Sequence, residues 1–134
     1  MPLTATKSCP CGSGNRPLDC CTGLILHGGE AQTAEQLMRS RYTAHTMLAI
    51  DYLWQTWSPE ERGASSPEAI REWASSCQWL GLEILACEAG LAHDNEGSVT
   101  FCARYRLGGR EQHHLEKSLF RREAGVWRYL RHAD

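Results

Sequence analysis

The chain has little that would direct it to a membrane or to a polyanion. Its first residues, MPLTATKSCP, contain no apolar stretch of the kind found in a secretory signal, and no apolar run elsewhere approaches the roughly 20 residues that span a bilayer. Fourteen Lys and Arg against sixteen Asp and Glu give a net charge of -2, so no broad basic surface is available for nucleic acid or anionic lipid. These absences favour a cytoplasmic protein with no membrane partner and no broad nucleic-acid binding.

Large apolar side chains are also scarce at the start of the chain. Residues 1–28 are rich in Cys, Gly, Pro and Ser, so they cannot bury enough apolar surface to form a core of their own. Residues 29–134 hold all five Trp and all four Tyr, which is enough for one ordinary core. The composition therefore predicts a small N-terminal module, residues 1–28, attached to a domain formed by residues 29–134.

The longer segment begins with helices and continues with strands. Thr33 stands just ahead of a Glu-Gln pair, as an N-cap residue does, and Pro67 suits the first turn of a helix, so we expect helices over 34–48, about 50–56 and from Pro67 onward. The turn sequences HDNEG, GGR and EAG then separate four segments of strand character. These segments cover residues 78–91, 98–107, 111–122 and 126–132. The order predicts an α+β fold in which helices are followed by a four-stranded antiparallel meander sheet.

Four of the seven cysteines lie within SCPCGSGNRPLDCC, residues 8–21. Four sulfur ligands, the number that tetrahedral zinc takes in structural sites, are available from Cys9, Cys11, Cys20 and Cys21. The Gly-Ser-Gly between the two pairs lets the backbone turn sharply, and adjacent cysteines in a helical turn point about 100° apart, close enough to reach one ion. Lys7 and Arg16 would offset the negative charge of four thiolates. A bound Zn²⁺ would supply the folding free energy that this core-poor module lacks.

Other states of the same cysteines stay open on spacing alone. Two disulfides could join Cys9 or Cys11 to Cys20 or Cys21, but they need an oxidising compartment, and no targeting signal indicates one. A redox switch or a Cu(I) site is also compatible, because soft thiolates bind Cu(I) as well as zinc. The spacing and the expected reducing compartment favour zinc.

The motif CPCGSGNRPLDCC resembles the SEC-C motif, a short zinc-binding module named for its place at the C-terminus of the SecA translocation ATPase. The rest of the chain resembles the YchJ-like family of bacteria, on the order and spacing of LMRSRYTAH, DYLWQTW, WLGLEIL, VTFCARY and LEKSLFRREAGVWRYL. The resemblance implies a nuclear transport factor 2-like cone over residues of about 30–134. It also implies zinc at the four cysteines, and thus a small N-terminal zinc-binding SEC-C knuckle.

A cone-shaped sheet covered by helices leaves a pocket lined by one face of the sheet. On the third expected strand His114, Glu116 and Ser118 share a face, and Arg39 and Arg41 of the first expected helix could lie opposite them. A buried carboxylate needs a partner, so the favoured interpretation is a structural ion pair between Glu116 and Arg39 or Arg41. Ligand contacts made by the same five residues are the alternative.

Two functions from different classes follow. The first is a non-enzymatic adaptor whose zinc module offers a rigid surface to a protein partner. Similarity to the SecA module, whose relatives contact a chaperone and ribosomes, links this adaptor to protein quality control or translation, with the ribosome as one candidate partner. The second is binding or conversion of a small molecule in the pocket. The sequence identifies no catalytic residue and predicts no oligomeric state.

Overall fold

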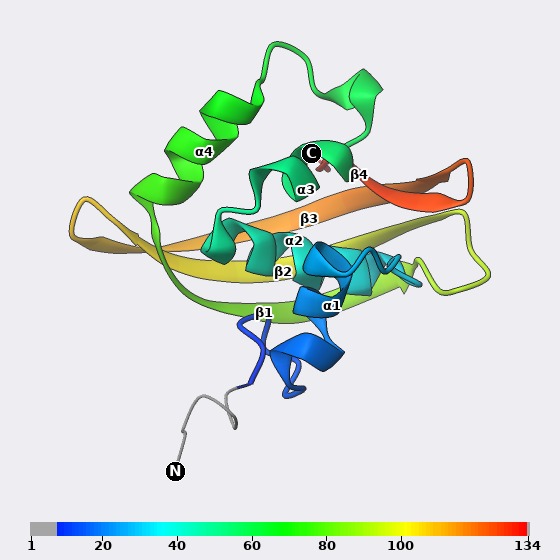
Figure 1. Ribbon diagram of the computed structural model, residues 1–134, viewed down its shortest axis with the longest axis horizontal. Helices are drawn as coiled ribbons and strands as arrows, with labels where there is room; N and C mark the ends of the chain where they lie inside the picture. The colour runs from blue at the N-terminus through cyan, green and yellow to red at the C-terminus, as the bar shows by residue number, and fades with distance from the viewer. Residues whose placement is uncertain (1–7, 134) are drawn as a thin grey trace.

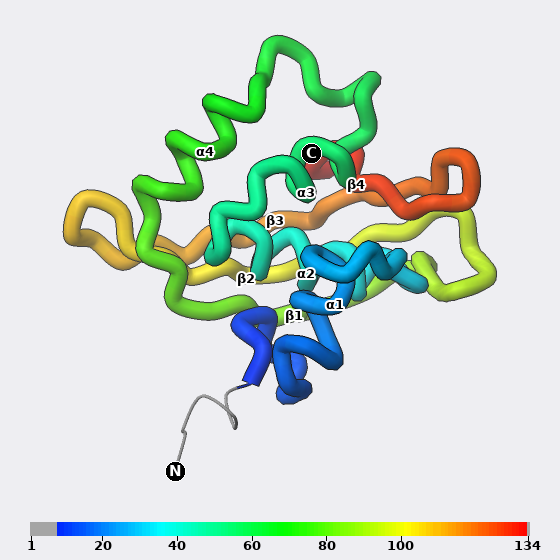
Figure 2. The backbone as a smooth tube through the Cα atoms, viewed as in Figure 1, coloured from blue at the N-terminus to red at the C-terminus, as the bar shows by residue number. Residues whose placement is uncertain are grey.

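Helices come first and strands last along the chain (Figures 1 and 2). The computed structural model describes residues 8–133. The helices are Cys21–Leu26 (α1), Ala34–Met47 (α2), Ile50–Gln55 (α3) and Pro67–Ser76 (α4), with 3-10 turns at Pro17–Asp19 and Pro59–Glu61. The strands are Gln78–Ala89 (β1), Glu96–Leu107 (β2), Arg110–Glu123 (β3) and Val126–His132 (β4). This order confirms the predicted α+β fold.

The longest helix, α2, begins and ends at residues that specify its bounds. The Thr33 hydroxyl accepts a hydrogen bond of 3.1 Å from the Gln36 backbone N–H, which caps the first turn. Leu48 follows the helix with a φ of 57°, a left-handed conformation that ends helices. Between these residues, Leu37, Met38 and Tyr42 are buried in the main core. Helix α2 is therefore the element that packs on the sheet.

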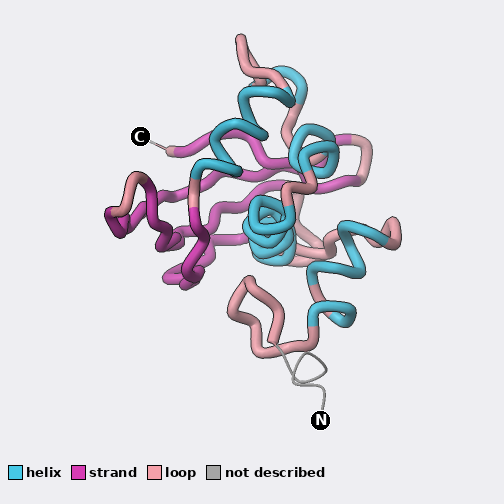
Figure 3. The backbone as a smooth tube through the Cα atoms, turned by 60° about the vertical axis from the view of Figure 1, so that its left-hand side comes forward, coloured by secondary structure: helices cyan, strands magenta, loops and turns pink. Residues whose placement is uncertain are grey.

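The strands pair antiparallel in the order β1-β2-β3-β4, which confirms the predicted meander. All helices lie on one side of this sheet (Figure 3). Val99, Phe101 and Ala103 of β2 join Phe120 and Trp127 in the core beneath α2. Two register shifts interrupt β1, and such bulges bend a strand and increase its twist. The sheet consequently curves around the helices.

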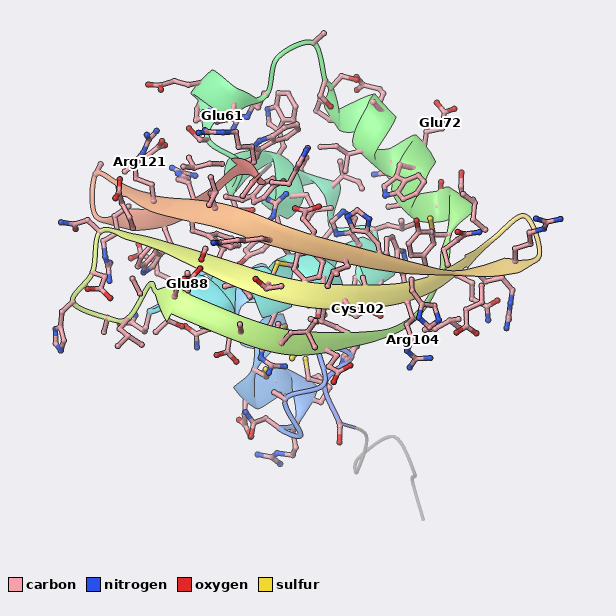
Figure 4. The ribbon with its side chains drawn as sticks, turned by 180° about the vertical axis from the view of Figure 1, so that it is seen from behind. Glu61, Glu72, Glu88, Cys102, Arg104 and Arg121 are labelled. Carbon is pink, nitrogen blue, oxygen red and sulfur yellow. The ribbon has the colours of Figure 1, made fainter. Side chains whose placement is uncertain are left out.

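The opposite face of the sheet is turned away from the helices. Cys102 and Arg104 of β2 point away from the helices, as Figure 4 shows from behind. This follows from the period of two along a strand, which places them opposite Phe101 and Ala103. Ligands between the helices and the sheet therefore meet only the inner face.

Helices α3 and α4 extend the fold beyond the main core. A second cluster of buried side chains joins Ala44 of α2 to Ile50 and Leu53 of α3, with Ile70 of α4 packed against it. Ala74 is the buried residue of α4, whereas Trp73 on the same helix is exposed. Helix α4 thus covers the inner face of the sheet without filling the space beneath it.

Residues 8–28 of the N-terminal module lie beside α2, and Gly12 approaches β1 (Figure 1). Its buried residues Cys9, Cys11 and Cys21 form a cluster of their own, against which Ile25 and Leu82 pack. Within residues 8–133, no helix combines the length and the apolar character needed to cross a bilayer.

Candidate functional site

The four cysteines of the N-terminal module converge on one point. Their Sγ atoms all lie within 4.8 Å of one another. The Sγ of Cys20 is 3.6 Å from that of Cys11 and 3.8 Å from that of Cys21. A zinc ion bonded to four sulfurs at about 2.3 Å sets neighbouring sulfurs about 3.8 Å apart, so closing the widest pair needs a shift of about 1 Å. The four residues therefore fit a tetrahedral metal ion.

A tight loop brings the two cysteine pairs together. The Cys9 backbone N–H donates to the Asn15 carbonyl (2.7 Å), and the Gly12 N–H donates to the Cys9 carbonyl (3.1 Å). Gly12 has a φ of 82°, and a Cβ built there would lie 3.0 Å from the Leu82 carbonyl of β1, so a side chain at this position would push the loop away from the strand. The loop and its docking on β1 depend on the same glycine.

The thiols share negative charge unevenly. The pKa of Cys11 is lowered to about 4, chiefly because the Cys21 thiol donates a hydrogen bond to its sulfur. The same bond raises the pKa of Cys21, and burial raises the pKa of Cys20. All seven cysteines are free, so the alternative of two disulfides is not formed in the structure. Crowded sulfurs of this kind ionise together when a cation neutralises them.

Of the basic side chains in residues 8–133, Arg39 is the one that donates a hydrogen bond to a cysteine of the cluster. Arg39 Nη1 donates to the Cys11 carbonyl at 2.7 Å, and its Nε lies 2.9 Å from Glu35 Oε2. Arg16 is paired with Asp19 at 2.7 Å on the surface, so a carboxylate already meets the charge expected beside the sulfurs. Lys7, the other expected cation, lies outside the described residues. The sequence analysis expected Arg39 to face the pocket. The direction of its side chain depends on how the N-terminal module docks on α2, and the sequence pattern does not contain that information.

A second feature is a cavity of about 620 Å³ between the helices and the inner face of the sheet. Four of the five predicted pocket residues line it: Arg41, His114, Glu116 and Ser118. Arg39 does not, because its guanidinium is bound to Glu35 and Cys11. Strand β3 supplies three of the four, and α2 supplies Arg41.

The Glu116 carboxylate is held by neutral donors and a histidine instead of an arginine. His114 Nε2 lies 2.8 Å from Oε1, while the hydroxyls of Ser118 (2.6 Å) and Tyr129 (3.3 Å) donate to Oε2. Among residues 8–133, no arginine nitrogen lies within 4 Å of this carboxylate, so the predicted ion pair with Arg39 or Arg41 is wrong. Burial raises the pKa of Glu116, but the hydrogen bonds from Ser118 and His114 outweigh it and hold the pKa below its ordinary value.

Two basic side chains of α2 border the cavity in different charge states. Burial lowers the pKa of Arg41 to about 10, which still leaves it charged at neutral pH. Burial and the nearby charge of Arg41 lower the pKa of His45 to about 4, so this imidazole is neutral. His45 Nδ1 donates to the Arg41 carbonyl at 2.8 Å, one turn back along the helix. Arg41 is thus the charged group that α2 brings to the cavity.

Aromatic side chains form most of the remaining wall, and the sequence had not assigned them to it. They are Tyr42, Trp57, Trp73, Trp79, Phe101, Tyr105 and Tyr129. Alternate residues of a strand share a face, so Tyr105 lies on the same inward face of β2 as Phe101. This pattern could have identified Tyr105 as a wall residue from the sequence. The tryptophans were expected in the core, but the position of α4 above the sheet leaves Trp73 and Trp79 facing the cavity.

Known proteins share both parts of this chain. A family model described as "YchJ, middle NTF2-like domain" matches residues 33–132. A UPF0225 protein of Geobacter sulfurreducens is 48% identical over 123 residues, which cover 91% of this chain and 76% of the relative. A UPF0225 protein of Chromobacterium violaceum is 43% identical over 128 residues, or 94% of this chain and 92% of the relative.

Two solved structures are similar over both the module and the domain. A SEC-C motif containing protein from Rhodopseudomonas palustris has a TM-score of 0.86 at 36% identity, covering 95% of this chain and 98% of that one. A SEC-C motif containing protein from Psychrobacter arcticus has a TM-score of 0.77 at 28% identity, covering 96% and 82%. The motif and the converging cysteines together suggest metal binding.

Proposed function

Because the chain belongs to the YchJ-like family, which joins a SEC-C motif to an NTF2-like domain, we propose that it is a zinc-binding, non-enzymatic adaptor for a protein partner. The observation that carries this proposal is the convergence of four sulfurs within 4.8 Å in a module whose buried residues are mainly those cysteines. An all-thiolate set is soft and selects zinc over hard cations such as Mg²⁺. Zinc would cross-link the module and supply folding free energy on the order of 10 kcal/mol. A reducing compartment such as the cytoplasm would keep the thiols available.

The outer side of the module supports the adaptor role. Leu18 is 63% exposed and Leu26 is 60% exposed, although both are large apolar residues. A module fixed by a metal and bonded to α2 would present them in a constant geometry, which favours binding of a protein surface. By analogy with the SecA module, a partner in protein quality control or translation, the ribosome included, is the first to examine.

Metal content tests the first half of the proposal. Native mass spectrometry of protein purified without added zinc should show one zinc ion per chain. The double variant Cys9→Ser, Cys20→Ser should lose the ion, and Cys102→Ser, which changes a cysteine outside the cluster, should keep it. Copper in place of zinc, or equal zinc in both variants, would contradict the proposal.

Partner capture tests the second half. The unchanged chain and the Cys102→Ser control should retain the same partner from cell extract, whereas the double variant should lose it while far-ultraviolet circular dichroism still shows the folded domain. Leu18→Glu should also weaken capture without changing the metal content, because it alters only the exposed surface. A partner retained equally by all variants would argue against the module as the binding surface.

The cavity supports a second candidate function, binding of a small molecule. Its volume of about 620 Å³ lies within the range of pockets for drug-sized ligands, roughly 300–1,000 Å³, and buried polar groups converge on it. A specific ligand should raise the melting temperature by mass action. Failure of a broad metabolite set to raise it, together with an unchanged cavity surface by NMR, would reject this candidate.

A further inference from the structure

Arg41 is a buried cation that uses only part of its hydrogen-bonding capacity. Its side chain is 8% exposed, and Nη1 donates to the Leu53 carbonyl (2.8 Å) and to Thr56 Oγ1 (2.6 Å). Within residues 8–133, Nε and Nη2 donate no hydrogen bond, yet neither is among the nitrogens that the protein encloses completely. Arg41 lines the cavity, so these two donors are available to a ligand bound there.

The charge of Arg41 has no direct counter-ion in the described part of the chain. Glu116, the carboxylate whose charge acts on Arg41, already accepts hydrogen bonds from His114, Ser118 and Tyr129. The Arg41 guanidinium carbon lies 4.7 Å from the centre of the Tyr129 ring, so the cation packs over this ring and forms no salt bridge with the carboxylate. A buried guanidinium with a free pair of donors is costly unless an anion meets it, and two parallel N–H groups match a carboxylate.

Aromatic rings form much of the cavity wall. Trp73 lies 5.6 Å from Tyr105, and Tyr105 lies 5.5 Å from Trp79, measured between ring centres. His45 lies 5.3 Å from Trp79 and is neutral, so it adds no competing charge. Rigid aromatic walls of this kind pack well against a planar apolar ligand body.

We propose that the cavity binds a small organic carboxylate with a planar apolar body, and that Arg41 receives the carboxylate while the rings of α4 and the sheet enclose the body. This inference rests on the proposal that the cavity is a ligand site. An organic cation would also suit aromatic walls, but it would meet the charge of Arg41, and three donors already occupy Glu116. The carboxylate is therefore the better match.

Matched ligands that differ only in charge test the inference on the unchanged chain. Isothermal titration calorimetry would compare phenylacetate and 2-naphthylacetate with their amides and with the corresponding primary amines. We expect each acid to bind at least tenfold more tightly than its amide, which corresponds to about 1.4 kcal/mol. The indole N–H signals of Trp57, Trp73 and Trp79 should shift on binding, and that of Trp127, which does not line the cavity, should not.

The outcomes separate the two proposals. Amides or amines that bind as tightly as the acids, with the same three indole signals shifting, would overturn the carboxylate assignment and leave the cavity as a ligand site. No binding by any of the compounds at millimolar concentration would overturn both. Acid binding without a shift of those signals would also overturn the assignment to this cavity.

A pair of variants links the preference to one side chain. Arg41→Gln removes the charge and keeps a polar side chain, so the acid-to-amide ratio should fall to about one. Arg106→Gln removes the same charge from the outer face of the sheet, where Arg106 bonds Gln78, and should leave the ratio unchanged. Equal ratios in the two variants would refute the role of Arg41. If Arg41→Gln fails to fold, the acid-to-amide ratio of the unchanged chain decides.

Discussion

Replacing Arg39 with Gln should weaken metal binding although Arg39 is not a ligand. Its Nη1 donates to the Cys11 carbonyl at 2.7 Å, and its side chain is only 20% exposed. The contact joins α2 to the loop that carries two of the four sulfurs. It forms only when that loop is folded, so its loss should reduce the affinity of the folded, metal-bound state.

The expected magnitude follows from the one interaction of Arg39 that depends on the folded loop. A hydrogen bond from a charged donor contributes about 1.5–3 kcal/mol when buried, and partial exposure places this one near the lower end. The pair with Glu35 lies within α2 and exists with or without metal, so it adds nothing to the affinity. The expected loss is therefore about 1.5 kcal/mol, or roughly tenfold in zinc affinity.

Competition with a chromophoric chelator at fixed ionic strength would measure this loss. Arg16→Gln is the matched control, because Arg16 is 71% exposed and paired with Asp19 on the surface. Exposed pairs contribute about 0–1 kcal/mol, so its affinity for zinc should change less than about fivefold. Equal losses in the two variants, or none in Arg39→Gln, would refute the assignment of Arg39 as the cation that supports the site.

Three further changes test the fold and the cavity. Leu53→Ala should lower the free energy of unfolding by about 3 kcal/mol in urea titrations, since this side chain is 0% exposed; a loss below about 1 kcal/mol would contradict its place in the second core. Glu116 has a pKa held below its ordinary value, so its carboxylate stabilises the fold above about pH 4.5, and this contribution disappears as the pH falls through the folded pKa. Glu116→Gln should therefore reduce the slope of the free energy of unfolding against pH on the acid side. An unchanged slope would show that the hydrogen bonds from Ser118 and His114 do not lower the pKa of Glu116. Gly97→Ala should destabilise the protein by on the order of 2 kcal/mol by thermal melting, because its Cβ would lie 2.4 Å from a backbone atom; an unchanged melting temperature would show that the β1–β2 turn can open.

The helices and strands could be predicted from the sequence because the residues that begin and end them act on their immediate neighbours. The Thr33 cap, Pro67 at a first helical turn and the glycine-containing turns each act within a few residues, and the structure confirms helices and strands at these places. The four cysteines could also be predicted as metal ligands from the sequence, since their spacing is a property of the chain itself. Convergence of their sulfurs in space then needed only the loop between them.

The directions of long side chains were not predictable in this way. Arg39 and Arg41 are two residues apart on α2, yet one meets the cysteine module and the other meets α3. That difference depends on which elements dock on each side of the helix, and no pattern within α2 contains it. The same applies to Trp73, which borders the cavity because α4 stands above the sheet.

The placement of the cysteine loop along β1 has a consequence for colloidal behaviour. β1 is an outer strand of the sheet, and the loop approaches it so closely at Gly12 that a methyl group there would crowd the Leu82 carbonyl. Unprotected outer strands pair with other copies of a chain and start aggregates. Removing the metal or oxidising the cysteines should therefore expose the unpaired edge of β1 to other copies of the chain. On addition of a chelator, turbidity should rise before the circular dichroism signal of the helices falls.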